Sequence, residues 1–171
     1  MFSEARPSQG VERERGGSRD ESPVLQFVGF RLGDEDYAIA ITKIQEIILM
    51  TPITRLPQAP PHIEGLINLR GSVIPIVNLR KRFGLPPRAP DDETRIVVVN
   101  VHNKTVGCVV DSVTRVMRIN RDQIQPPPSG VGGATSQYLA GLARRDDGLL
   151  LLLDIDGLIQ VEEPESPPAA L

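Results

Sequence analysis

Short apolar runs fill the middle of the chain, and polar turn dipeptides separate them. These dipeptides are Gly33-Asp34, Arg70-Gly71, Asn103-Lys104 and Asp147-Gly148. Short strands with turn signals between them are typical of all-β sandwiches and barrels. No long pattern of helical period interrupts the strands. The sequence therefore predicts an all-β fold with short helical turns only.

The strand pattern occurs twice along the chain. Residues 30–47 and 99–116 each contain a strand, a polar turn, a second strand and then apolar residues at every third position. Residues 65–79 and 141–155 also match, because each has a Gly-Leu start, a strand, a turn and a five-residue apolar strand. One structural unit used twice accounts for the whole folded length.

Each copy is too small to form a sandwich of its own. Two small five-stranded barrels fit better, because closure of a barrel removes exposed strand edges. Asn78 and Asp154 follow the last strand of each copy, where their side-chain oxygens can cap a short helix. The sequence leaves open whether the two barrels exchange strands.

Composition divides the chain into a folded domain and two tails. Residues 1–22 and 162–171 are polar without periodicity, and we expect them to be disordered. Residues 23–161 form the predicted domain. A Pro-rich break after residue 85 divides this domain into two units, residues 24–85 and 94–160.

Charge and composition exclude some functions. The 171 residues carry a formal net charge of −3 and only 4% aromatic residues. Binding to nucleic acid requires a basic surface, and binding to single strands adds aromatic stripes. A nucleic-acid-binding pair of barrels is therefore the weaker alternative. No apolar secretory signal is present in the first 23 residues, which predicts a cytoplasmic protein.

The residues that could carry catalysis do not converge on a site. His62 and His102 lie in predicted loops without a partner at metal-ligand spacing. Cys108 is the single cysteine and lies in an apolar strand, where a thiol is usually inert. The Gly-rich residues 129–133 lack the Lys-Ser/Thr of a phosphate-binding loop. We therefore expect no enzyme activity, no cofactor and no metal site.

Two segments carry features that a simple barrel does not need. Residues 44–50 have more apolar side chains than a strand with one buried face, which indicates cover by the other barrel or by a partner. Residues 65–80 are rich in Gly and contain Pro75 inside a strand pattern, which indicates an edge or a bulge. Arg70 lies in a turn of this segment and is free to reach a carboxylate, for which Glu46 is the candidate.

These segments resemble the CheW family of chemotaxis coupling proteins. The resemblance rests on residues 32–37 (LGDEDY), 41–47 (ITKIQEI), 60–80, 107–113 (GCVVDSV) and 138–142 (YLAGL). The run from Asn68-Leu69-Arg70-Gly71 to Asn78-Leu79-Arg80 is the most specific part. Asn78 departs from the family pattern, in which Asp is usual.

The resemblance implies two SH3-like barrels around a central apolar interface, acting as a scaffold without catalysis. Such an adaptor binds the cytoplasmic tip of chemoreceptors and the regulatory domain of the CheA histidine kinase in membrane-associated receptor arrays, without nucleic acid and without direct membrane insertion. An adaptor of a parallel pathway, such as type IV pilus or gliding control, is the alternative. The positions implied to bind partners are Ile44, Glu46, Gly65, Asn68, Arg70, Gly71, Gly107 and Val116.

Overall fold

The computed structural model describes residues 23–128, 138–146 and 148–160. The two predicted tails, residues 1–22 and 162–171, lie outside the described residues, as does the Gly-rich segment 129–133. No helix in the described part of the chain is long and apolar enough to cross a membrane.

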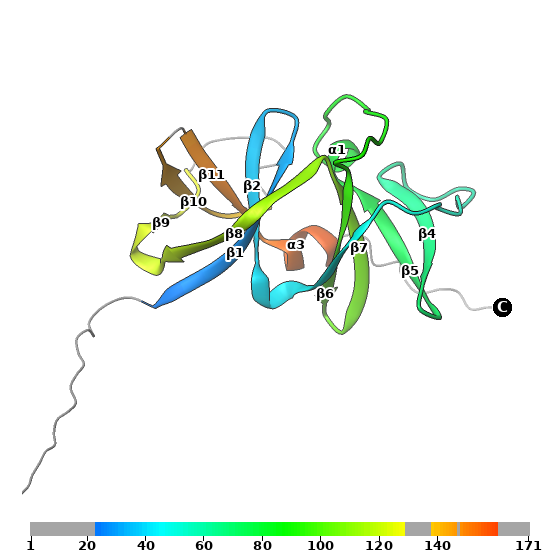
Figure 1. Cartoon of the computed structure of the whole chain (residues 1–171), viewed down its shortest axis with the longest axis horizontal. Coiled ribbons are helices and arrows are strands. Elements are labelled where there is room, and N and C mark those ends of the chain that lie inside the picture. Colours follow the sequence, from blue (N-terminus) through cyan, green and yellow to red (C-terminus); the bar gives the residue numbers. More distant parts are fainter. Residues whose placement is uncertain (1–22, 129–137, 147, 161–171) are drawn as a thin grey trace, which may run out of the picture.

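Short strands make up most of the structure (Figure 1). The first half contains β1 (Val24–Leu32), β2 (Glu35–Ala40), η3 (Ile41–Lys43), β3 (Ile44–Leu49), β4 (Ile63–Leu69), β5 (Ser72–Asn78) and α1 (Leu79–Arg82). The second half contains β6 (Arg95–Val101), β7 (Lys104–Val110), β8 (Ser112–Asn120), η4 (Arg121–Gln123), β9 (Ile124–Gln125), β10 (Leu139–Arg145), β11 (Gly148–Leu153) and α3 (Ile155–Gln160). The predicted all-β fold with short helices is confirmed.

The two halves have a similar order of strands and the same strand register. They differ in that η3 precedes β3 whereas η4 follows β8, and in the additional short strand β9. Ile47 of β3 pairs with Val97 of β6, and the equivalent Val116 of β8 pairs with Val28 of β1. Each half ends on a helix whose N-cap is an Asx side chain. Asn78 accepts a hydrogen bond from the Lys81 N–H at 3.2 Å, and Asp154 accepts one from the Gly157 N–H at 3.1 Å.

Each sheet takes strands from both halves of the chain. One sheet has the order β8-β1-β2-β11-β10-β9, and the other has the order β3-β6-β7-β5-β4. The first hairpin of each half joins the second hairpin of the other half through a parallel pair, β2 with β11 and β7 with β5. We call the two sheets the six-stranded barrel and the five-stranded barrel. The sixth strand is the two-residue β9.

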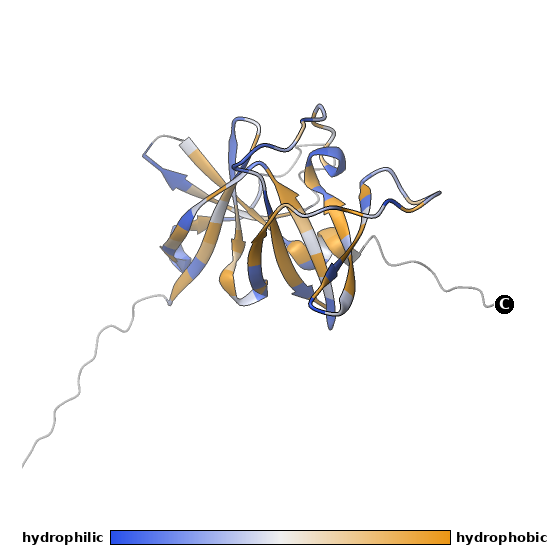
Figure 2. Cartoon of the chain, turned by 45° about the vertical axis from the view of Figure 1, so that its right-hand side comes forward, coloured by the Kyte–Doolittle hydropathy of each residue, from blue (hydrophilic) through white to orange (hydrophobic). Residues whose placement is uncertain are grey.

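Hydrophobic residues are frequent along the strands (Figure 2). Their buried side chains form three clusters. One cluster fills the six-stranded barrel and a second fills the five-stranded barrel. The third and largest lies between the barrels and draws on both. We call it the seam. Strand alternation explains the division, because Ile96 and Val98 of β6 face the barrel interior whereas Val97, Val99 and Val101 face the seam.

A row of aromatic rings crosses the seam. Phe30 stacks on Tyr37 with ring centroids 5.7 Å apart, and Tyr37 stacks on Phe83 at the same distance. Phe83 contacts Tyr138 at 6.4 Å, and the Arg82 guanidinium lies 4.8 Å from the Tyr138 ring centroid. Most of the few aromatic residues in the chain thus hold β1, β2, α1 and the start of β10 together.

Leu158 tests how strongly the seam holds the two barrels together. Its side chain is fully buried in the seam, so Leu158→Ala should lower the free energy of unfolding by about 2–5 kcal/mol. Leu149 is 51% exposed, and Leu149→Ala should cost less than about 0.5 kcal/mol. Urea unfolding followed by circular dichroism measures both. Two separate transitions in the wild-type chain would contradict a shared core.

Candidate functional site

The predicted pair of Glu46 and Arg70 is present at one end of the five-stranded barrel. Arg70 and Gly71 form the two-residue turn between β4 and β5, and both have positive φ, at 50° and 92°. This is the turn geometry that suits a tight hairpin. Asn68 Oδ1 accepts a hydrogen bond from the Gly71 N–H at 2.9 Å, which holds the turn closed. Arg70 then reaches across to form an ion pair with Glu46 of β3.

This ion pair faces solvent. The Arg70 side chain is 67% exposed, and Glu46 is 25% exposed. Three hydrogen-bonded polar side chains lie beside it. Asn100 Nδ2 donates to Gln45 Oε1 at 2.9 Å, and Thr105 Oγ1 donates to Asn100 Oδ1 at 3.0 Å. We call the ion pair and its turn the Glu46 mouth of the five-stranded barrel. An exposed ion pair contributes little to stability, so its arrangement suits contact with another molecule.

Two of the predicted glycines lie inside the barrel packing. Gly65 has a φ of 149°, and a Cβ there would lie 2.1 Å from the Thr54 carbonyl oxygen, where β4 meets the loop after β3. Gly107 lies in β7, where a Cβ would lie 2.6 Å from Ile76 Cδ1. Any effect of these two positions on partner binding would therefore act through the shape of the barrel.

Ile44 and Val116 lie at the rims of the seam. Ile44 of β3 and Val113 of β8 are half-buried and pack against the seam cluster. Beyond them, Ile47 is 38% exposed and Val116 is 51% exposed. Because β3 and β8 are edge strands of the two sheets, the seam continues at both edges onto exposed apolar side chains. The predicted residues thus fall into three groups, namely the Glu46 mouth, the barrel interior and the seam rims.

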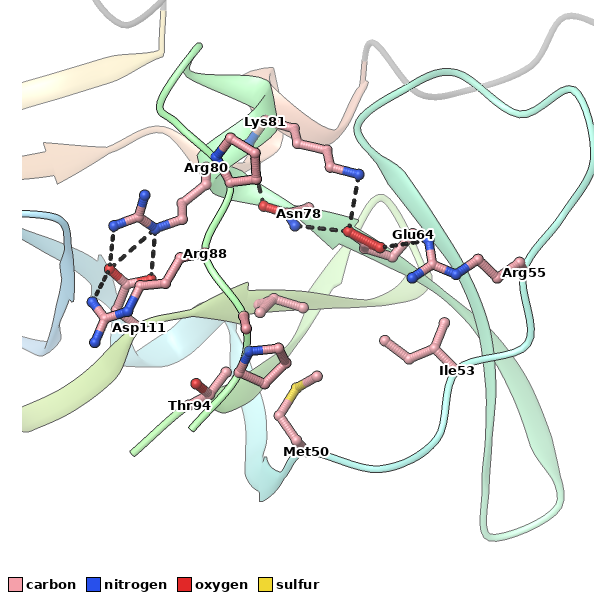
Figure 3. Close-up of a pocket in the computed structure, with 14 residues that line it drawn as sticks. Met50, Ile53, Arg55, Glu64, Asn78, Arg80, Lys81, Arg88, Thr94 and Asp111 are labelled. Atoms are coloured by element: carbon pink, nitrogen blue, oxygen red, sulfur yellow. Dashed lines mark hydrogen bonds and ion pairs between the residues drawn. The ribbon is translucent and has the colours of Figure 1, made fainter. Parts of the chain in front are cut away.

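A separate polar cleft of about 390 Å³ lies beside the loop that joins the two halves. Asp111 is the center of one side of it (Figure 3). It accepts hydrogen bonds from Arg80 Nε at 2.9 Å, from Arg88 Nη1 at 3.1 Å and from the Gly33 N–H at 2.8 Å. The chain passes from β7 to β8 at Asp111, so this carboxylate connects the first hairpin turn, α1 and the joining loop.

Glu64 is the center of the other side of the cleft (Figure 3). Asn78 Nδ2 donates to its Oε2 at 2.7 Å, and Lys81 and Arg55 each form an ion pair with it at 3.3 Å. An Asp in place of Asn78 would put a second carboxylate against Glu64. Asn78, which departs from the family pattern, is therefore the residue that suits Glu64 here, because its amide can donate a hydrogen bond to that carboxylate.

The charged neighbours lower the pKa of both carboxylates. Burial alone would raise the pKa of Asp111, but the hydrogen bonds from Arg80 and the Gly33 N–H, with the charges of Arg80 and Arg88, bring it below its ordinary value. At Glu64, burial likewise raises the pKa, and the hydrogen bonds of Asn78 and Lys81 reverse the shift. Burial raises the pKa of Cys108 to about 12, so its thiol stays protonated and unreactive.

The sequence interpretation missed the residues of this cleft. Asp111 and Arg80 were inside recognisable motifs, but neither motif indicated that they meet. The only available signal was a lone acid in the apolar run 106–113. Among the described residues, no three possible metal ligands come together. The cleft residues are paired with each other, which points to a structural role.

Comparisons with known proteins agree with this geometry. Residues 26–163 match the family described as the CheW-like domain. A chemotaxis protein CheW of Klebsiella aerogenes is 38% identical over 138 residues, which cover 81% of this chain and 83% of that protein. One of Helicobacter pylori is 35% identical over 141 residues, covering 82% of this chain and 85% of that protein. The crystal structure of the scaffolding protein TtCheW from Thermoanaerobacter tengcongensis superposes with a TM-score of 0.76 at 34% identity, covering 83% of this chain and 97% of that one.

Asp111 provides a test of the polar cleft by stability and pH. Asp111→Asn removes the charge that faces Arg80 and Arg88 and should lower the free energy of unfolding by about 3 kcal/mol at pH 7. The exposed pair of Arg31 and Asp36 gives the control, since Asp36→Asn should cost less than about 1 kcal/mol. Urea unfolding measures both variants.

The same variant predicts a pH dependence with a defined sign. An unfolded Asp has a pKa of about 3.9, and folding lowers the pKa of Asp111. Its contribution is therefore complete above this pH and is lost as the pH falls through the lower folded value. Below about pH 4, stability should decrease more steeply in the wild-type chain than in Asp111→Asn. Parallel slopes would contradict the low pKa.

Proposed function

Since the chain belongs to the CheW-like domain family and is a non-enzymatic chemotaxis scaffold, we propose that it couples the cytoplasmic tips of chemoreceptors to the regulatory domain of the CheA histidine kinase. The observation that carries the proposal is the Glu46 mouth, because its turn lies in the motif most specific to the family and its ion pair joins that turn to Glu46 of the 41–47 motif. Recruitment to membrane-associated receptor arrays follows from the same coupling.

The seam supports a mechanism without chemistry. Both barrels pack against the seam, so they act as a single rigid body. Partners bound at separate places on such a body are held at a fixed distance and orientation. The signal then passes as a change in the relative affinity or geometry of the bound partners.

The seam rims are the surface that best suits the receptor. Ile47 on β3 and Val116 on β8 extend the seam cluster with exposed apolar side chains. A helical tip binds to a partner through an apolar face laid into an apolar groove. We therefore assign the receptor tip to the rims of the seam.

The Glu46 mouth is the surface that best suits the kinase. It combines the exposed Arg70 and the ordered Asn68 turn with Val73, which is 63% exposed at the start of β5. An arginine flanked by an exposed apolar side chain is typical of residues that contribute strongly to an interface. The two partners would then occupy different places on the scaffold and bind at the same time.

Arg70→Glu tests the Glu46 mouth. The substitution replaces an ion pair with two facing carboxylates at an exposed site, so the fold should be retained and receptor-dependent activation of the kinase should be lost. The measurement is kinase phosphorylation in assemblies of receptor, kinase and adaptor. Arg31→Glu is the control, because Arg31 is also exposed and paired, and it lies on the other barrel. Normal activation by Arg70→Glu would rule out the role given to Arg70.

Val116→Glu tests the seam rim. Val116 is 51% exposed, so a charge there should leave the fold intact but weaken binding of a receptor tip by about tenfold or more. Val24 is 48% exposed on β1 and gives a matched control, since Val24→Glu changes the same residue type outside the rim. Co-sedimentation with receptor-tip assemblies measures both. Equal binding by the two variants would place the receptor elsewhere.

A further inference from the structure

The six-stranded barrel has a mouth equivalent to the Glu46 mouth, but with different charges. The duplicated strand pattern places Arg115 of β8 at the position of Glu46, and the turn between β10 and β11 at the position of the Arg70 turn. The register agrees, because Ile44 pairs with Val99 and the equivalent Val113 pairs with Phe30. The two mouths therefore have the same backbone plan and can be compared residue by residue.

Four arginines line a cleft of about 420 Å³ at this second mouth. We call it the arginine cleft. Arg115 and Arg118 reach it from β8, and Arg144 and Arg145 reach it from the end of β10. Asp146 is the one acid among the described lining residues. Arg115, Arg118 and Arg144 are exposed, and Arg145 is half-buried.

These arginines have no partner of opposite charge among the described residues. The ion pairs of the described chain involve other arginines, namely Arg31, Arg55, Arg70, Arg80 and Arg88. The whole chain carries a net charge of −3, so an uncompensated positive cleft is not a result of a basic composition. Like charges held close together repel one another, and an anion that enters the cleft relieves this repulsion.

We propose that the arginine cleft docks an acidic segment of a partner protein, with its carboxylates bound by Arg115, Arg118 and Arg144. The equivalent mouth of the other barrel already joins an arginine to a carboxylate, through Arg70 and Glu46. Guanidinium groups bind carboxylates through two parallel hydrogen bonds, which gives geometric selection as well as charge. By the register of the two hairpins, Asp146 stands at the position of Arg70, so this mouth has one acid against four arginines. A partner carboxylate would supply negative charge to the arginines that remain.

Protein carboxylates fit the cleft better than the phosphates of nucleic acid or lipid. Binding of single-stranded nucleic acid uses aromatic stacking, but Phe30, Tyr37, Phe83 and Tyr138 are occupied in the row across the seam. Stable binding to a lipid surface needs an inserted apolar group besides basic residues. The lining of the cleft instead combines arginines with Gln123, Ala143 and Ile119, which suits a short peptide segment.

Binding of a labelled acidic peptide to the full chain tests this proposal. The probe is a ten-residue peptide of alternating Glu and Gly, and the same peptide with Gln in place of Glu is the neutral control. Fluorescence anisotropy should show binding of the Glu peptide only, and added salt should weaken it. The double variant Arg118→Glu with Arg144→Glu should weaken binding by about tenfold or more.

A second double variant separates the cleft from overall charge. Arg31→Glu with Arg55→Glu changes the net charge by the same amount at exposed sites outside the cleft, and it should bind the peptide within about twofold of wild type. Equal weakening by both double variants would overturn the proposal. Binding of duplex DNA or phosphatidylserine vesicles in preference to the peptide would overturn it as well. The assay contains neither receptor nor kinase, so its outcome is independent of the proposed coupling function.

Discussion

Burial of the central strands on both faces is the constraint on which the structure depends. Strands β1, β2, β6 and β7 each place one face in a barrel interior and the other face in the seam. A barrel on its own would expose fully buried side chains such as Ile39, Val97 and Val99 to water. Each such side chain contributes about 1.5–3 kcal/mol when it is buried. The barrels are therefore stable as a pair, and strand exchange between the halves links them covalently as well.

An apolar seam holds the barrels together but does not by itself fix their orientation, because apolar contact is not directional. The hydrogen bonds of Asp111 are directional and fix this orientation. Asp111 lies where the chain crosses between the barrels and binds the first hairpin turn through the Gly33 N–H and the helix α1 through Arg80. Breaking one of these bonds would leave a charge without its partner in a partly buried place. A scaffold that relays signals by position needs this kind of fixed geometry.

Much of the fold could be predicted from the sequence, because local signals carried it. The turns, the two-copy pattern and the caps at Asn78 and Asp154 each depend on neighbouring residues, and the structure has them. The exchange of hairpins could not be predicted, since the parallel pair of β2 and β11 joins residues from opposite ends of the domain. The turn position of Arg70 indicated its ion pair with Glu46. It gave no indication of the Asp111 cleft, whose members come from three distant segments.

The duplicated unit has diverged most clearly at the two barrel mouths. The backbone is equivalent at Glu46 and Arg115, yet one position carries a negative charge and the other a positive charge. An adaptor with two identical mouths would offer every partner two equivalent docking orientations, and assemblies would form with mixed register. At the Glu46 mouth the acid is neutralised by Arg70, whereas the arginines of the arginine cleft have no acidic partner among the described residues. An acidic partner segment therefore favours the arginine cleft over the Glu46 mouth, which removes that ambiguity. Two copies of one small barrel thus form a rigid body. Because their mouths differ in charge, the two ends of this body can bind different partners.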